Sequence, residues 1–228
     1  MIYGKNFCVV FILKRGRNLI HKKTQLTHAK PFIKEIEMSK QAKTLTVGEL
    51  RRVLDYCATR KHASRNRALV MTTFLSGMRV GEVASLRYSD VLDTSGKIRN
   101  EIRLTAEQTK GSEGRVVFVS EKLQKELEKY ATNLSVTSIE DKFFYSQKST
   151  SNGFSANTLT QFFHYLYKKA GVDGASSHSG RRTFITNLAS KGVGVRVLMS
   201  LSGHKNISTT QAYIDVNDDM KRRAVELV

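Results

Sequence analysis

Six side chains spread along this sequence can each act on a phosphate group. They are two arginines, one lysine, two histidines and one tyrosine, in the order Arg79, Lys110, His178, Arg181, His204 and Tyr213. An arginine offers a planar fork of donors that matches two phosphate oxygens, and a lysine can protonate an oxygen that leaves phosphorus. Histidines can position or relay protons, and a tyrosine phenol can attack phosphorus as a covalent nucleophile. The set predicts phosphoryl transfer without a metal ion, because two arginines can carry the transition-state charge.

Taken alone, none of these residues indicates an active site. Arg79 stands at a break between two expected helices, and Lys110 lies on a polar turn. His178 and Arg181 are one helical turn apart and therefore share a helix face. Tyr213 lies on an expected amphipathic helix, where a tyrosine usually belongs to the core. The prediction therefore depends on the complete ordered set and not on any single motif.

The elements expected to position these residues are mostly helices. Thr46 and Glu49 have the spacing of a capping box at the start of the first helix, and Ser64 is the expected cap of the second. Hydrophobic periodicity predicts helices near residues 46–60, 64–77, 80–86, 121–131, 156–169, 178–191, 195–202, 207–214 and 217–227. Two strands near residues 97–105 and 115–120 flank a polar hairpin tip. The predicted fold class is mainly α with a small antiparallel β-sheet (α+β).

The charge of the chain favours a polyanionic partner. The sequence has 38 Lys and Arg against 20 Asp and Glu, which gives a formal net charge of +18. Nucleic acid is the leading candidate, and an ordinary basic protein is the alternative. The two cysteines, Cys8 and Cys57, cannot build a disulfide framework, which fits a reducing cytoplasm. The apolar run 7–13 leads into Lys14 and Arg15 instead of a cleavage site, which argues against export.

The start of the chain differs from the rest. Residues 1–37 hold eight Lys and Arg against two Glu and show no sustained periodicity. Met38 opens a more conventional stretch, and we hypothesise that it is the native start. We therefore expect a basic N-terminal extension over residues 1–45 and one main domain over residues 46–228.

Over residues 46–228 the chain resembles the catalytic domain of the tyrosine recombinases, also called phage integrases. Residues 75–86 look like the first-arginine box of that family, and residues 109–111 look like its lysine hairpin. His178-x-x-Arg181 is similar to the central box, and residues 201–214 match the final box with the tyrosine. One departure is Gly180, where many members carry a leucine; it should change packing and not chemistry.

The resemblance implies a role for each of the six residues, with no cofactor and no metal. Tyr213 would attack a phosphodiester, form a 3′-phosphotyrosyl link and release a 5′-hydroxyl. The two arginines would hold the phosphate. Lys110 would protonate the leaving oxygen, His178 would assist proton transfer, and His204 would hydrogen-bond the phosphate.

The resemblance also implies the partners. The substrate would be double-stranded DNA, bound by a homotetramer with no membrane involved. Ser177, Arg182 and Lys205 flank the predicted pocket residues and are predicted DNA contacts. Residues 1–45 do not read as the core-binding domain that normally precedes the catalytic domain, so we also consider an accessory DNA-bending or core-binding partner. The expected location is the cytoplasm, at the nucleoid.

Three functions stay open at this point. The first is a site-specific recombinase or integrase that breaks and rejoins DNA strands. The second is a truncated recombinase that only binds DNA, which the missing domain favours and the complete set of six residues disfavours. The third is DNA relaxation like that of a type IB topoisomerase, whose pocket is similar.

Overall fold

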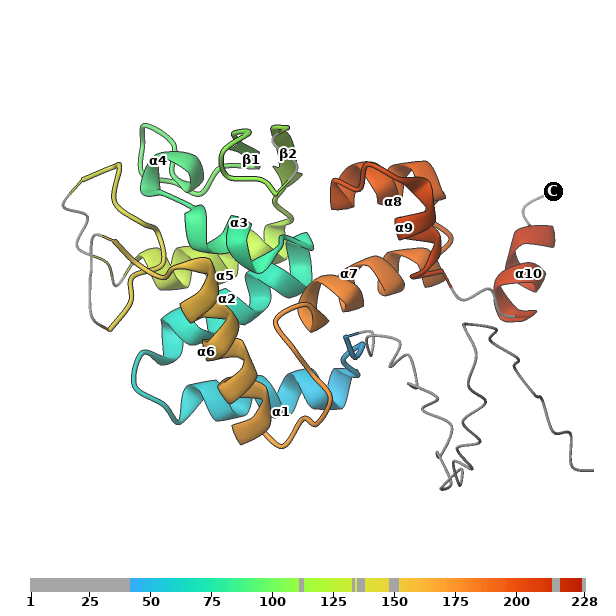
Figure 1. Cartoon of the computed structure of the whole chain (residues 1–228), viewed down its shortest axis with the longest axis horizontal. Helices are drawn as coiled ribbons and strands as arrows, with labels where there is room; N and C mark the ends of the chain where they lie inside the picture. The colour runs from blue at the N-terminus through green and yellow to red at the C-terminus, as the bar shows by residue number, and fades with distance from the viewer. Residues whose placement is uncertain are drawn as a thin grey trace, which may run out of the picture. The chain divides into compact units, whose positions relative to one another are not determined.

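The computed structural model describes residues 42–110, 113–132, 134, 138–147, 152–214 and 218–226. The expected N-terminal extension and Met38 thus lie almost wholly outside the described residues. Within them no helix has the length and apolar character of a membrane span. The elements are α1 (Val47–Ala58), α2 (Ala63–Ser76), α3 (Val80–Ser85), α4 (Tyr88–Val91), β1 (Glu101–Leu104), β2 (Arg115–Phe118), α5 (Glu121–Ala131), α6 (Ala156–Lys169), α7 (Ser179–Ser190), α8 (Val195–Ser202), α9 (Ile207–Gln211) and α10 (Asp218–Val225) (Figure 1).

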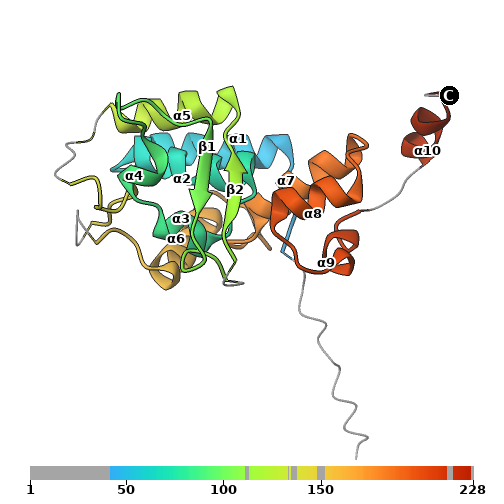
Figure 2. The same cartoon turned by 90° about the horizontal axis from the view of Figure 1, so that it is seen from above.

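The two strands form the antiparallel hairpin that the alternation of apolar residues predicts. Ile102 of β1 lies opposite Val117 of β2, and both side chains are buried. Phe118 points the other way and is 59% exposed. Figure 2 shows the strands side by side across the helices. The predicted fold class, mainly α with a small antiparallel sheet, is confirmed, although both strands are shorter than expected.

Helix α2 occupies the centre of the core and contacts α1, α3, α5 and α7. Partners on so many sides explain its weak amphipathicity, because a helix buried all round needs no polar face. Leu69 and Val70 are fully buried on adjacent faces. Beside this core, Tyr130 stacks on Phe144 and donates its hydroxyl to the carbonyl of Phe143, at 2.9 Å.

Most helix ends follow the sequence signals, with two exceptions. The helix predicted over residues 207–214 is wrong at its end, because α9 ends at Gln211 and Tyr213 lies in the turn beyond it. The capping box of Thr46 and Glu49 forms as predicted. The prediction that Ser64 caps α2 is wrong, because the helix begins one residue earlier and its N-cap is His62. His62 adopts a left-handed backbone with φ 64°, and its Nδ1 lies 2.9 Å from the hydroxyl of Tyr145. A tertiary contact 83 residues away thus accompanies this helix start, which local capping rules could not anticipate.

The close approach of α2 and α7 explains why Gly180 stands where a leucine was expected. A Cβ at Gly180 would lie 2.3 Å from Oγ1 of Thr73 and 3.1 Å from the backbone carbonyl carbon of Thr73. Both separations are too short for van der Waals contact. Any side chain here would push α7 away from α2, and α7 carries Arg181 one residue later.

We therefore predict that Gly180→Ala lowers the free energy of unfolding by about 1–3 kcal/mol through overpacking. Urea denaturation would measure this loss. Adding Thr73→Ala should recover part of it, because it removes the nearer of the two clashing atoms. Gly48→Ala is the matched control, since nothing lies within 4 Å of a Cβ there and α1 should gain about 0.4–1 kcal/mol. Equal effects of Gly180→Ala and Gly48→Ala would contradict the packing argument.

Candidate active site

Arg79 precedes α3 and is held from two directions. Its backbone N–H donates to Oε2 of Glu82 at 2.7 Å, and its Nη1 donates to Oε1 of the same carboxylate at 2.9 Å. Its Nη2 donates to the carbonyl of Gly203 at 3.0 Å. The side chain remains 25% exposed, so the guanidinium is fixed in direction while one part of it still faces solvent.

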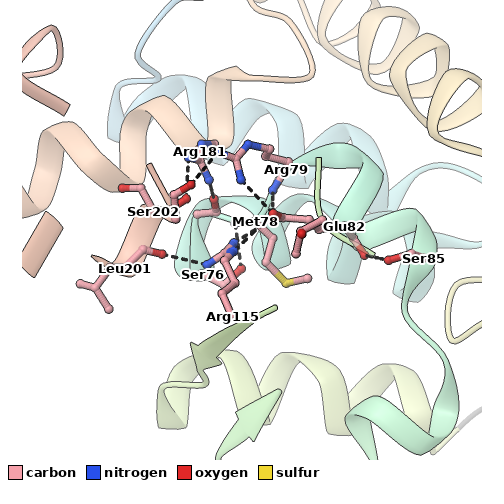
Figure 3. A network of polar contacts seen from close by, with 12 residues as sticks. Ser76, Met78, Arg79, Glu82, Ser85, Arg115, Arg181, Leu201 and Ser202 are labelled. Carbon is pink, nitrogen blue, oxygen red and sulfur yellow. Dashed lines mark hydrogen bonds and ion pairs between the residues drawn. The ribbon is translucent and has the colours of Figure 1, made fainter. Parts of the chain in front are cut away.

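Arg181 on α7 is only 4% exposed and donates to two backbone carbonyls. Nη1 bonds the carbonyl of Gly77 and Nη2 bonds that of Ser202, each at 2.7 Å. Burial, followed by the positive charge of Arg79, lowers the pKa of Arg181 to about 9. Arg181 therefore stays charged at neutral pH but lacks full compensation, which favours a bound anion. Figure 3 shows Arg79 and Arg181 at the centre of one polar network.

Arg115 on β2 belongs to this network, although the motif analysis does not select it. Its Nη2 donates to Oε2 of Glu82 at 2.7 Å, and its Nη1 donates to the carbonyl of Leu201 at 2.9 Å. The alternation of inward and outward residues along the strand could have identified Arg115 from the sequence, because Arg115 lies on the same strand face as the buried Val117. A charged residue on the inward face of a strand indicates a buried partner.

Glu82 is that partner and is 1% exposed. Burial raises the pKa of its carboxyl, but hydrogen bonds and charge from Arg115 and Arg79 outweigh burial and leave the pKa below its ordinary value. The charged carboxylate therefore joins α3 to β2. Sequence reasoning missed Glu82 as well, since an acidic residue in the first turn of a helix is common for capping alone.

His204 follows the end of α8 and is buried. Its Nδ1 lies 2.9 Å from Oγ1 of Thr210, which fixes the plane of the ring. Burial, then the charges of Arg181 and Arg79, lower the pKa of His204 to about 4. The preceding Gly203 has φ 62°, and a Cβ there would approach Cδ of Arg115 to 2.6 Å. The imidazole is thus neutral at pH 7 and directly adjoins the arginine network.

Tyr213 comes from the same chain as the two arginines and lies beside this histidine. Its ring stacks on that of His204 with 5.8 Å between centroids and 18° between planes. Cζ of Arg182 lies 5.2 Å from the centroid of the tyrosine ring. The negative charge that Tyr213 would carry raises the pKa of Arg181, so the phenol is within electrostatic reach of that guanidinium.

His178 and Lys110 complete the set. His178 is the N-cap residue of α7 and is exposed. Partial desolvation, then the charges of Arg181, Arg79 and Lys110, lower the pKa of His178. Lys110 is exposed on the hairpin, and it lines one cavity of about 900 Å³ together with Arg79 and His204. Tyr213, Arg181 and His178 are not among the described residues that line this cavity, so Tyr213 is connected with it through its contact with His204.

Basic residues outnumber acidic residues in the wall of this cavity. Five basic residues line it against one acidic residue, Glu113; they are Arg79, Lys110, Arg115, Arg196 and Lys205. Lys205 pairs with Glu113 at 2.9 Å in an exposed contact. Such a surface attracts phosphate. Of the other two predicted DNA contacts, Ser177 is 7% exposed, and Arg182 donates from Nε to Oγ1 of Thr44 at 3.2 Å.

Comparisons with known proteins identify the family and agree with this fold. Residues 43–220 match the phage integrase family. Tyrosine recombinase XerA of Thermococcus kodakarensis is 31% identical over 185 residues, which are 81% of this chain and 62% of the relative. Transposase A from transposon Tn554 of Staphylococcus aureus is 26% identical over 223 residues, covering 93% of this chain and 60% of the relative.

Solved structures show the same arrangement. The crystal structure of XerA recombinase superposes with a TM-score of 0.64 at 26% identity, covering 81% of this chain and 64% of that one. The Tn1549 transposon integrase in complex with transposon right end DNA gives a TM-score of 0.61 at 19% identity, over 82% of this chain and 66% of that one. Because its sequence identity to this chain is only 19%, the Tn1549 integrase structure supports the fold alone.

The chain belongs to the phage integrase family, the tyrosine recombinases, and has the fold of their catalytic domain. It spans about three fifths of the length of the relatives named above. The family connects it with DNA recombination and DNA binding.

We predict that Arg115→Gln lowers the free energy of unfolding by about 3–5 kcal/mol, because it leaves the buried Glu82 carboxylate with one partner fewer. Urea denaturation would measure the change. Arg103→Gln is the control, since Arg103 makes an exposed pair with Glu101 at 3.4 Å and should cost about 0–0.5 kcal/mol. A loss below about 1 kcal/mol for Arg115→Gln would show that the buried pair contributes little.

We also predict a dependence of stability on pH that arises from His204. Its pKa is about 4 in the folded state against 6.5 for an ordinary histidine, so the unfolded chain binds more protons between these values. The free energy of unfolding should therefore fall as pH decreases from 6.5 to 4, by about 3 kcal/mol from this residue. Denaturant titrations at several pH values should show a shallower fall for His204→Gln. An unchanged slope would contradict this assignment.

Proposed function

We propose that this protein is a site-specific DNA recombinase or integrase that cuts and rejoins strands through a 3′-phosphotyrosyl intermediate. The observation that carries the proposal is the placement of Tyr213. Its ring stacks on His204 at 5.8 Å, beside two arginines whose guanidinium groups are already fixed by carbonyls and a carboxylate. A nucleophile next to preorganised phosphate donors is the arrangement that phosphoryl transfer needs.

The reaction can be written with atoms in balance. The Tyr213 hydroxyl oxygen attacks phosphorus, the bond from phosphorus to the 5′-oxygen breaks, and Lys110 supplies the proton that makes a 5′-hydroxyl. The phenol proton passes to His178, which is neutral at pH 7 because its pKa is lowered. A 5′-hydroxyl from a partner strand then attacks the phosphotyrosine and restores both the backbone and the free tyrosine. The number of phosphoester bonds is conserved, so no nucleotide hydrolysis is required.

Arg79 and Arg181 stabilise the negative charge that develops on the phosphate in the transition state. Arg79 and Arg181 donate to the non-bridging oxygens, and His204 adds a donor from its neutral ring. Both guanidinium groups spend part of their donors on carbonyls, which fixes them before DNA arrives and avoids reorganisation during the reaction. The cationic cavity wall holds the phosphate backbone on either side.

The biological setting follows from the relatives. The substrate is double-stranded DNA, on which the protein acts as a homotetramer at the nucleoid in the cytoplasm, and Ser177, Arg182 and Lys205 are the proposed contacts to the DNA backbone. The Tn554 transposase A match over 93% of this chain supports a role in moving a genetic element. An accessory DNA-bending or core-binding partner is part of this proposal.

The test of this proposal is the detection of a covalent adduct between the protein and DNA. The protein is incubated with DNA flanking its own gene in EDTA, and the reaction is quenched with SDS. We predict a protein–DNA adduct that Tyr213→Phe abolishes and that Tyr165→Phe, which changes an exposed tyrosine of α6, leaves intact.

Any other outcome would indicate a different function for the protein. A gel shift without an adduct would indicate a DNA-binding module. An adduct with relaxation of supercoiled DNA but no recombined product would indicate topoisomerase-like activity. An adduct that survives in Tyr213→Phe would place the nucleophile elsewhere.

A further inference from the structure

A second cavity lies away from the residues described so far. It has a volume of about 620 Å³ and shares no lining residue with the Arg79 cavity. Its walls come from the end of α1, the start of α2, one face of α6 and the described residues before α6, from Ser146 and Gln147 to Gly153, Phe154 and Ser155. In Figure 1 these three helices meet at the lower part of the helical body. Its size lies in the range of small-molecule sites.

The basic residue at the bottom of this cavity is Arg65, which is 3% exposed. Its Nε and Nη2 donate to Oδ1 of Asn66 at 3.3 and 3.0 Å, and its Nη1 donates to the carbonyl of Tyr145 at 3.1 Å. Both acceptors are neutral. Among the described residues no carboxylate pairs with Arg65, although a buried guanidinium normally requires such a partner.

The donor count of Arg65 leaves capacity for a ligand. A guanidinium has five N–H donors, and three of them make the bonds given above. The two that remain lie on Nη1 and Nη2, the pair of nitrogens that binds phosphate or carboxylate side by side. Aromatic rings cover the group, with Tyr145 at 5.0 Å and Phe154 at 5.1 Å from Cζ. These rings orient the guanidinium and leave its edge as the available surface.

The rest of the lining has the same preference for an anion. Arg60, Lys61 and Lys169 line the cavity, and its described lining contains no Asp or Glu. Arg65 and Asn66 also belong to the first turns of α2, a helix of 14 residues whose N-terminal end carries partial positive charge.

Aromatic side chains form the apolar part of the wall. Tyr56, Phe162 and Tyr165 line the cavity, and Tyr165 is 63% exposed. Exposed aromatic rings beside cations are the elements with which proteins bind a nucleobase and its phosphate together. A cavity of about 620 Å³ is large enough for one nucleotide.

We infer that this second cavity is a nucleotide site, in which Arg65 binds a phosphate and the aromatic wall stacks on the base. The same chemistry could come from a free nucleotide or from an unpaired nucleotide at the end of a DNA strand. The site is independent of the reaction proposed for Tyr213, since the two cavities have no residue in common.

The test is calorimetric titration of the full chain carrying Tyr213→Phe, so that no cleavage occurs. The ligands are dAMP, a 5′-phosphorylated tetranucleotide and inorganic phosphate. We expect at least one of the first two to bind more tightly than phosphate. Lys169→Glu should weaken this binding at least tenfold, and Tyr165→Ala should weaken it several-fold. Lys168→Glu is the matched control, because Lys168 is the exposed neighbour that does not line the cavity, and it should change binding less than twofold.

Comparable affinity for dAMP and the tetranucleotide would identify a free nucleotide as the ligand, and binding of the tetranucleotide alone would identify a strand end. Arg65→Lys, checked for folding by circular dichroism, should weaken binding as well. The inference is overturned if neither nucleotide binds, or if Lys205→Glu and not Lys169→Glu weakens binding, since the ligand would then occupy the first cavity. Binding of an acidic aromatic peptide in place of nucleotides would also overturn it. The adduct assay with Tyr213 intact is unaffected by any of these results.

Discussion

The carboxylate of Glu82 lies between two guanidinium groups, with Arg79 on one side and Arg115 on the other. These three residues come from a helix start and a strand, and both arginines reach on to carbonyls at the end of α8. Burying one carboxylate is costly unless its oxygens are saturated by donors, and here four N–H donors saturate them. The position of the pocket walls relative to one another depends on this shared charge.

Helix ends supply the other fixed points. The last carbonyls of a helix have no partner within it, and they carry partial negative charge. Arg181 binds the carbonyls of Gly77 and Ser202, at the ends of α2 and α8, and Arg79 binds the carbonyl of Gly203. Neutral acceptors orient the arginines without cancelling their charge. Burial, and then the excess positive charge, lowers the pKa of the nearby His178 and His204.

The two cavities illustrate how the same residue type can serve different ends. In the first, Arg79 and Arg115 share the buried carboxylate of Glu82. In the second, Arg65 is buried under aromatic rings with only neutral oxygen atoms as acceptors. Arg79 is fixed by a partner of opposite charge, whereas Arg65 is fixed by neutral acceptors and aromatic rings and has no described carboxylate partner.

Local patterns in the sequence were sufficient for most helices and for the hairpin, because periodicity and caps act over a few residues. They could not reveal that α2 starts at His62, that Gly180 must be small, or that Arg115 and Glu82 support Arg79. Arg115 and Glu82 are 33 residues apart in the chain, and Arg181 and Gly77 are 104 apart. Such contacts exist only once the helices have packed, since packing decides which charges share a buried space and which atoms are too close for a Cβ.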